Sequence, residues 1–167
     1  IKPETLSSIA KANAIVTTHD QAIDLIDHSR VHIISKSLNL TDLPRTASAI
    51  SETKNGVVGV MVAHLREQKN PFLYLRAVPY LESGIRVEHY GRAASQEFSE
   101  EANRYRSEAY EWKGEIPRTQ MLERMHRADF LLNTSHVEGS SNALFEAIAL
   151  KIPIIATAIP GNIGVLG

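Results

Sequence analysis

Apolar runs of strand length alternate with segments of helical period along most of the chain. From Gly56 onward the alternation is regular, and a strand-plus-helix unit recurs about every 30 residues. Such alternation is typical of a parallel sheet covered by helices on both faces, because each unit returns the chain to the same edge of the sheet. The pattern therefore predicts an α/β fold.

Strands are predicted at 56–63, 85–90, 110–113, 130–132 and 152–158. Helices are predicted from about Pro71, over 95–105, over 117–128, and around an inward face of Leu144, Ala147 and Ile148. Pro79 should end or kink the first helix because proline has no N–H to donate. Trp112 is expected in the core. Together these elements predict a Rossmann-like parallel sheet over 56–167.

The first 55 residues are predicted to form a smaller unit and a linker. Strands at 14–18 and 31–34 flank a short helix over 21–28, so residues 1–37 read as a β-α-β unit. Residues 38–55 are polar, lack a clear period and are interpreted as a linker. Because the chain starts with Ile1 and stops in a glycine-rich stretch at Gly167, we expect a fragment of a longer protein.

Composition narrows the classes of function. The 18 Lys and Arg against 19 Asp and Glu give a net charge of -1, so no global field attracts nucleic acid or an anionic membrane. No apolar run approaches the roughly 20 residues of a membrane-spanning helix. The absence of cysteine excludes disulfides and thiolate chemistry, and it is compatible with a cytoplasmic enzyme. We expect a cytoplasmic protein with no nucleic acid as partner and no integral membrane segment.

The segment 135–146 comes soon after the strand predicted at 130–132, in a place where ligands collect in doubly wound sheets. Its glycine and serines let a backbone approach a ligand closely, and the helix that starts there offers free N–H groups to a diphosphate. Glu146, about two turns into that helix, has the chemistry to accept hydrogen bonds from the ribose hydroxyls. The alternative is that Glu146 is a solvated helix carboxylate.

Glu138 and Glu146, separated by seven residues, resemble the signature of the retaining glycosyltransferases of family 4, two-domain enzymes of GT-B architecture. Ala128-Asp129 before the strand, Ser135, Ala147 and Pro153 agree with this resemblance, which covers most of 56–167. It implies a donor-binding half that uses a UDP-sugar, without a cofactor or an essential metal. Residues 1–37 would be a remnant of a missing N-terminal acceptor-side domain, and the fragment alone is expected to be inactive.

The same resemblance assigns roles to residues of this chain. Glu138 and Lys69 would be catalytic, with Lys69 neutralising the departing diphosphate. Donor binding would fall to His64, Arg66, Ser135, Gly139, Ser140, Ser141, Asn142 and Glu146. The family has an arginine where His64 stands, and histidine lacks the forked guanidinium donor. Arg66 either compensates for that loss or is a solvated loop residue.

A narrower resemblance involves the segments 64–72, 110–117 and 160–167. They are similar to a bacterial subgroup that includes selenosugar synthases, although Ser140-Ser141 stand where the subgroup often has Gly-Ala. This similarity implies selenophosphate as the acceptor and a new carbon–selenium bond.

Two other functions stay open: a UDP-sugar epimerase of the same architecture, and a non-catalytic nucleotide-binding or interaction module. A nicotinamide dehydrogenase is disfavoured because no Gly-x-Gly-x-x-Gly follows a strand. A metal site is disfavoured because His136, two residues before Glu138, has no clear second metal ligand at short spacing.

Overall fold

The computed structural model describes residues 12, 15–17, 31–33, 41, 43–44 and 56–167. The strands β1 (Ile15–Thr17) and β2 (Val31–Ile33) pair in parallel and form a separate two-stranded sheet. Both coincide with predicted strands. The helix predicted over 21–28 and most of the linker predicted over 38–55 lie outside the described residues.

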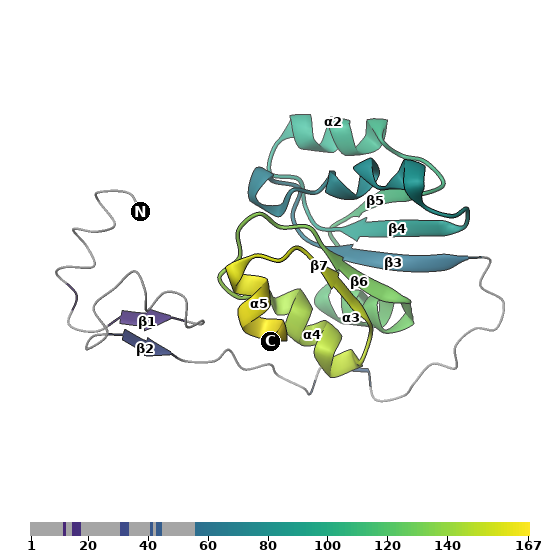
Figure 1. Ribbon diagram of the computed structural model, residues 1–167. Helices are drawn as coiled ribbons and strands as arrows, with labels where there is room; N and C mark the ends of the chain where they lie inside the picture. The colour runs from purple at the N-terminus through teal and green to yellow at the C-terminus, as the bar shows by residue number, and fades with distance from the viewer. Residues whose placement is uncertain (1–11, 13–14, 18–30, 34–40, 42, 45–55) are drawn as a thin grey trace.

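The main sheet has five parallel strands in the order β5-β4-β3-β6-β7 (Figure 1). The strands are β3 (Val57–Val62), β4 (Ile85–Tyr90), β5 (Tyr110–Gly114), β6 (Phe130–Asn133) and β7 (Ile154–Ala156). The chain runs outward from β3 to β5 and then returns to place β6 on the other side of β3. The strand order therefore reverses between β3 and β6, the position at which such sheets bind ligands.

Four α-helices connect or follow these strands: α2 (Gln96–Arg104), α3 (Arg118–Arg127), α4 (Asn142–Leu150) and α5 (Pro160–Leu166). Successive strand residues enter different cores: Val60 packs in the cluster that contains α3 and α4, and Met61 packs in the cluster on the other face. This alternation follows from the two-residue period of a strand. The predicted Rossmann-like sheet with both faces covered is confirmed.

The α-helix predicted from Pro71 is wrong. The segment after Pro71 forms the short 3-10 helices η5 (Leu73–Arg76) and η6 (Val78–Tyr80) instead, and another 3-10 helix, η4 (Glu67–Lys69), precedes it. Asn70 adopts a left-handed backbone with φ 43°, and Pro79 has no N–H with which to continue an α-helical ladder. Aromatic packing holds the segment in place, because Phe72 stacks on Phe98 of α2 with ring centroids 6.3 Å apart.

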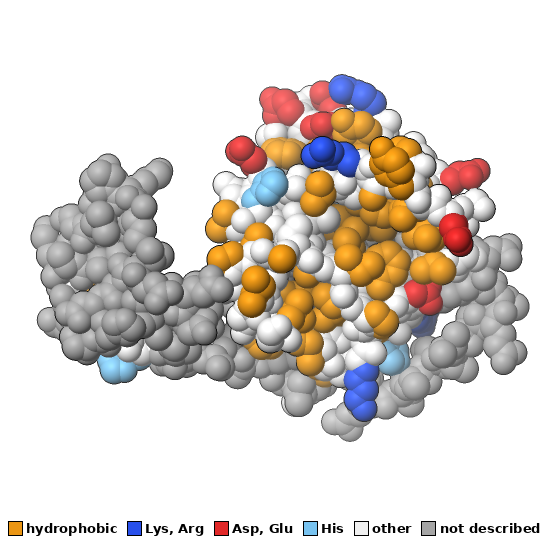
Figure 2. Space-filling model, viewed as in Figure 1, with side chains coloured by type: hydrophobic (Ala, Val, Ile, Leu, Met, Phe, Trp, Pro, Cys, Tyr) orange, Lys and Arg blue, Asp and Glu red, His pale blue; other side chains and the backbone are white. Residues whose placement is uncertain are grey.

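The inward face of α4 also differs from the prediction. Leu144 and Ala147 are fully buried as expected, but Ile148 is 47% exposed. The buried face is rotated toward Glu146, which is only 4% exposed. A carboxylate on the inner face does not register in a hydrophobic pattern, and this explains the error. Ile148 on α4 is exposed, as are Ile155 on β7 and Ile163 and Leu166 on α5. Hydrophobic side chains gather on the face where Figure 1 places these elements (Figure 2).

Trp112 packs against the second core cluster, as predicted. Helix α5 was not predicted, and β7 is shorter than the strand expected over 152–158. Within the described segments, no helix is long and apolar enough to cross a membrane.

Candidate functional site

A cavity of about 580 Å³ opens where the segments after β3, β5 and β6 meet the start of α4. All but two of the residues predicted to act on the donor line it: His64, Arg66, Lys69, Glu138, Ser140, Ser141, Asn142 and Glu146. The exceptions are Ser135 and Gly139. The fold thus brings together side chains that are up to about 80 residues apart in sequence, because parallel strands end at one edge of the sheet.

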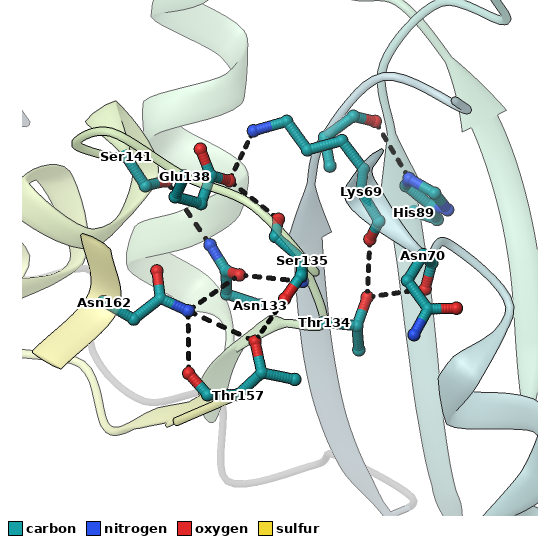
Figure 3. Close-up of polar contacts among 11 residues, drawn as sticks. Lys69, Asn70, His89, Asn133, Thr134, Ser135, Glu138, Ser141, Thr157 and Asn162 are labelled. Carbon is teal, nitrogen blue, oxygen red and sulfur yellow. Dashed lines mark hydrogen bonds and ion pairs between the residues drawn. The ribbon is translucent and has the colours of Figure 1, made fainter. Parts of the chain in front are cut away.

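Hydrogen bonds join the loop after β6 to the loop after β3. The Thr134 hydroxyl donates to the carbonyl oxygens of Lys69 and Asn70, at 3.1 and 2.9 Å (Figure 3). The His136 N–H donates to the Gln68 carbonyl at 2.9 Å. These contacts fix Lys69 opposite the 138–146 segment.

Glu138 forms the centre of this junction. The Lys69 ammonium and the Ser135 hydroxyl both donate to Glu138 Oε1, the hydroxyl at 2.7 Å. The side chains of Lys69 and Glu138 are only 15% and 9% exposed. Ser135 is buried and does not line the cavity, so in this structure it orients Glu138.

A buried amide network supports the loop from below. Asn133 Oδ1 accepts from the Ser135 N–H at 3.1 Å and from Asn162 Nδ2 at 3.3 Å (Figure 3). Asn162 also donates to the Thr157 carbonyl at 2.9 Å. Gly161 lies so close that an added Cβ would sit 2.0 Å from the Glu138 carbonyl oxygen. The 160–164 segment, which carried no predicted role beyond its part in the narrower resemblance, therefore positions Glu138.

Glu146 is paired across the helices. The Arg118 guanidinium, in the first turn of α3, donates to Glu146 Oε1. The interpretation of Glu146 as a solvated helix carboxylate is wrong, since its side chain is 5% exposed. Sequence reasoning missed Arg118. The sequence feature that could have indicated it is an arginine directly after Pro117, at the start of a predicted helix. A cation at that position lies at the positive end of the helix dipole, so it needs a nearby acid.

Helix α4 begins at the cavity, with Ser141, Asn142 and Ala143 on the lining. The Ser141 side chain makes no capping hydrogen bond to the first turn, and its hydroxyl accepts instead from Asn133 Nδ2 at 3.4 Å. A helix start that lines a cavity without this cap has the arrangement of an anion site.

His64 and Arg66 both line the cavity, so Arg66 has a place in the site despite its exposure. The Arg92 N–H donates to His64 Nδ1 at 3.3 Å. The neutral ring therefore carries its proton on Nε2, which can act as a donor.

A buried histidine supports this loop. His89 is fully buried, its Nε2–H donates to the Ala63 carbonyl at 2.9 Å, and its Nδ1 accepts from the Tyr110 hydroxyl at 2.8 Å. The carbonyl accepts only, which fixes this tautomer. Burial lowers the pKa of His89 to about 4, against a smaller opposing effect of the hydrogen bond to Ala63. A neutral His89 thus anchors the residue that precedes His64.

Across the described ranges, no group of three His, Cys, Asp or Glu residues is arranged to hold a metal ion.

The chain is similar to several known proteins. It is 38% identical over 52 residues to glycosyltransferase 1 domain-containing protein 1 of Xenopus tropicalis, a match that covers 31% of this chain and 15% of that protein. The structure of Anabaena HepE in complex with UDP-glucose has a TM-score of 0.77 and 15% identity, over 91% of this chain and 46% of HepE. A glycosyltransferase from Rickettsia africae has a TM-score of 0.74 and 15% identity, over 96% of this chain and 49% of that one.

At such identities the solved structures show the shared fold, which is the Rossmann-like half of the GT-B architecture. The chain spans about half the length of these two structures. The sequence pattern of one family, "Glycosyl transferases group 1", matches residues 45–167. That range is most of the chain, which therefore belongs to the group 1 glycosyl transferases.

Proposed function

We propose that this chain is the donor-binding half of a retaining glycosyltransferase of family 4 that uses a UDP-sugar. One observation carries the proposal: two glutamates, a lysine and an uncapped helix start line a single cavity at the point where the strand order reverses. Residues 1–37 would be a remnant of the acceptor-side domain, and residues 38–55 would be a linker. The acceptor-side domain would be the partner that completes the cleft.

In this proposal, the start of α4 and Lys69 hold the diphosphate, and Glu146 accepts hydrogen bonds from the ribose. In the transition state, negative charge grows on the departing diphosphate while positive charge grows at the anomeric carbon. Fixed donors at the phosphates lower the barrier because they need no reorganisation. Lys69 must exchange its contact with Glu138 for one with phosphate, which leaves Glu138 beside the sugar.

Selenophosphate is the acceptor that the narrower resemblance suggests. Its selenium would attack the anomeric carbon, the bond from that carbon to the diphosphate oxygen would break, and UDP would leave with the electron pair. No cofactor or metal ion enters this scheme, and a cytoplasmic location is part of the same proposal.

The test joins this chain to its acceptor-side domain and supplies UDP-sugars with and without selenophosphate. We expect UDP release that depends on the acceptor, and a product whose anomeric configuration, read by NMR, matches that of the donor. A product with inverted configuration would refute retention. Conversion of the sugar without any acceptor would instead favour the epimerase. Binding of UDP without turnover of any donor and acceptor pair would favour a non-catalytic module.

A further inference from the structure

A second cavity, of about 330 Å³, adjoins the first. His64 and Arg66 line both cavities, whereas Arg92, Ala93 and Ala94 line only the second. Among the described residues, none from 138–146 reaches it. A ligand bound there would lie beside the segment that we assign to the donor.

The two cavities differ in charge. The first is balanced, with three cations facing three carboxylates: Arg66, Lys69, Arg118, Glu115, Glu138 and Glu146. The described lining of the second has two arginines and no carboxylate. Lys69 and Arg118 are bound to glutamates, but neither Arg66 nor Arg92 forms an ion pair within the part of the chain that the structure describes. Both arginines line one cavity, and an anion bound between their guanidinium groups would stabilise both charges.

The backbone holds these arginines at a fixed spacing. The Leu65 N–H donates to the Arg92 carbonyl at 3.0 Å, and the Ala94 N–H donates to the Leu65 carbonyl at 2.9 Å. Leu65 is fully buried and anchors the junction. Gly91 permits this approach, since an added Cβ would lie 2.1 Å from the Ala63 carbonyl oxygen and its φ is 145°. The cavity is thus preorganised by two loops that hydrogen bonds connect.

We propose that this second cavity binds the phosphate group of the acceptor substrate, apart from the diphosphate of the donor. The inference rests on the proposed function, because it assigns the first cavity to the donor. Arg66 and Arg92 would donate charge-assisted hydrogen bonds to the phosphate oxygens. The shared residues His64 and Arg66 would place that phosphate next to the donor cavity.

The test titrates inorganic phosphate into the chain saturated with UDP, at constant ionic strength, and follows backbone amide signals by NMR. We expect saturable shifts at Ala93 and Ala94. Arg92→Gln should raise the phosphate dissociation constant about tenfold or more, with a smaller effect for Arg92→Lys. The affinity for UDP should change by less than about twofold, because Arg92 lines only the second cavity. Arg76→Gln, at an exposed arginine that lines neither cavity, is the matched control.

Unsaturable phosphate shifts, or equal phosphate affinity in the chain and in Arg92→Gln, would overturn the inference. A loss of UDP affinity in Arg92→Gln would overturn it as well, because the arginine would then serve the donor diphosphate. If UDP fails to bind the unmodified chain, the proposed function fails instead. The phosphate titration without UDP then tests the second cavity on the same Ala93 and Ala94 signals.

Discussion

Glu146 is a carboxylate on the buried side of a helix whose other inward residues are apolar, so it needs a counter-charge. Arg118 supplies that charge from α3. The spacing of the glutamates predicted a role for Glu146, but its partner depends on how α3 packs against α4. A local sequence pattern cannot predict which residues of two different helices form such a pair.

We predict that Arg118→Gln lowers the free energy of unfolding by about 1–2 kcal/mol, because it leaves the buried Glu146 carboxylate without a partner. The loss is no larger because the Arg118 side chain is itself half exposed. Urea denaturation measures the change. Arg124→Gln, at an exposed arginine in the same helix, should cost less than about 0.5 kcal/mol. Adding Glu146→Gln to Arg118→Gln should recover part of the loss; no loss in the single variant would contradict this view of the pair.

His89 predicts a pH dependence of stability. Its pKa is about 4 in the folded chain and about 6.5 when unfolded, so the unfolded state binds more protons between these values. Stability should therefore fall as pH falls from 6.5 to 4, by about 3 kcal/mol from this residue. In His89→Gln this contribution should vanish. Urea denaturation of both proteins at pH 7 and pH 4 measures it, and an equal decline in both would contradict the assignment.

At the scale of elements, strands and α-helices with a clear period were predicted well. The strands β3 to β6 and the helices α2 and α3 lie close to their predicted bounds, because burial on one or both faces determines their residues. Helix α4 contains the three residues predicted for it, although its buried face differs from the prediction. The η4 to η6 segment was not predicted, since its conformation depends on Asn70, Pro79 and packing against α2. Helix α5, which contains two glycines, carries no helical period strong enough to indicate it.

The packing of β3 against β6 predicts a specific coupling. An added Cβ on Gly59 would lie 2.2 Å from the ring of Phe130, the residue paired with it across the strands. Gly59→Ala should therefore lower the free energy of unfolding by about 1–3 kcal/mol through overpacking. Combining it with Phe130→Leu should cost less than the sum of the two single changes. Additive effects in a double-mutant cycle would show that the ring moves aside without cost.

At the scale of the whole molecule, the sheet order creates the site. The alternation of strands and helices predicted a parallel sheet, but it did not specify that β6 returns to the side of β3. That crossover brings Lys69 to Glu138 and leaves two cavities side by side. A net charge of -1 conceals a basic second cavity, since charge counted over the chain says nothing of its distribution.

The affinity of the chain for UDP, measured by calorimetry with and without Glu146→Gln, shows whether Glu146 binds the ribose of the donor. We predict that the variant binds UDP about tenfold more weakly, because a carboxylate that accepts from ribose hydroxyls is lost. Both proteins should bind a UDP analogue without ribose hydroxyls with the same affinity. Glu123→Gln, at an exposed glutamate of α3, is the control. Equal affinity of the chain and the Glu146→Gln variant for UDP would show that Glu146 does not bind the ribose.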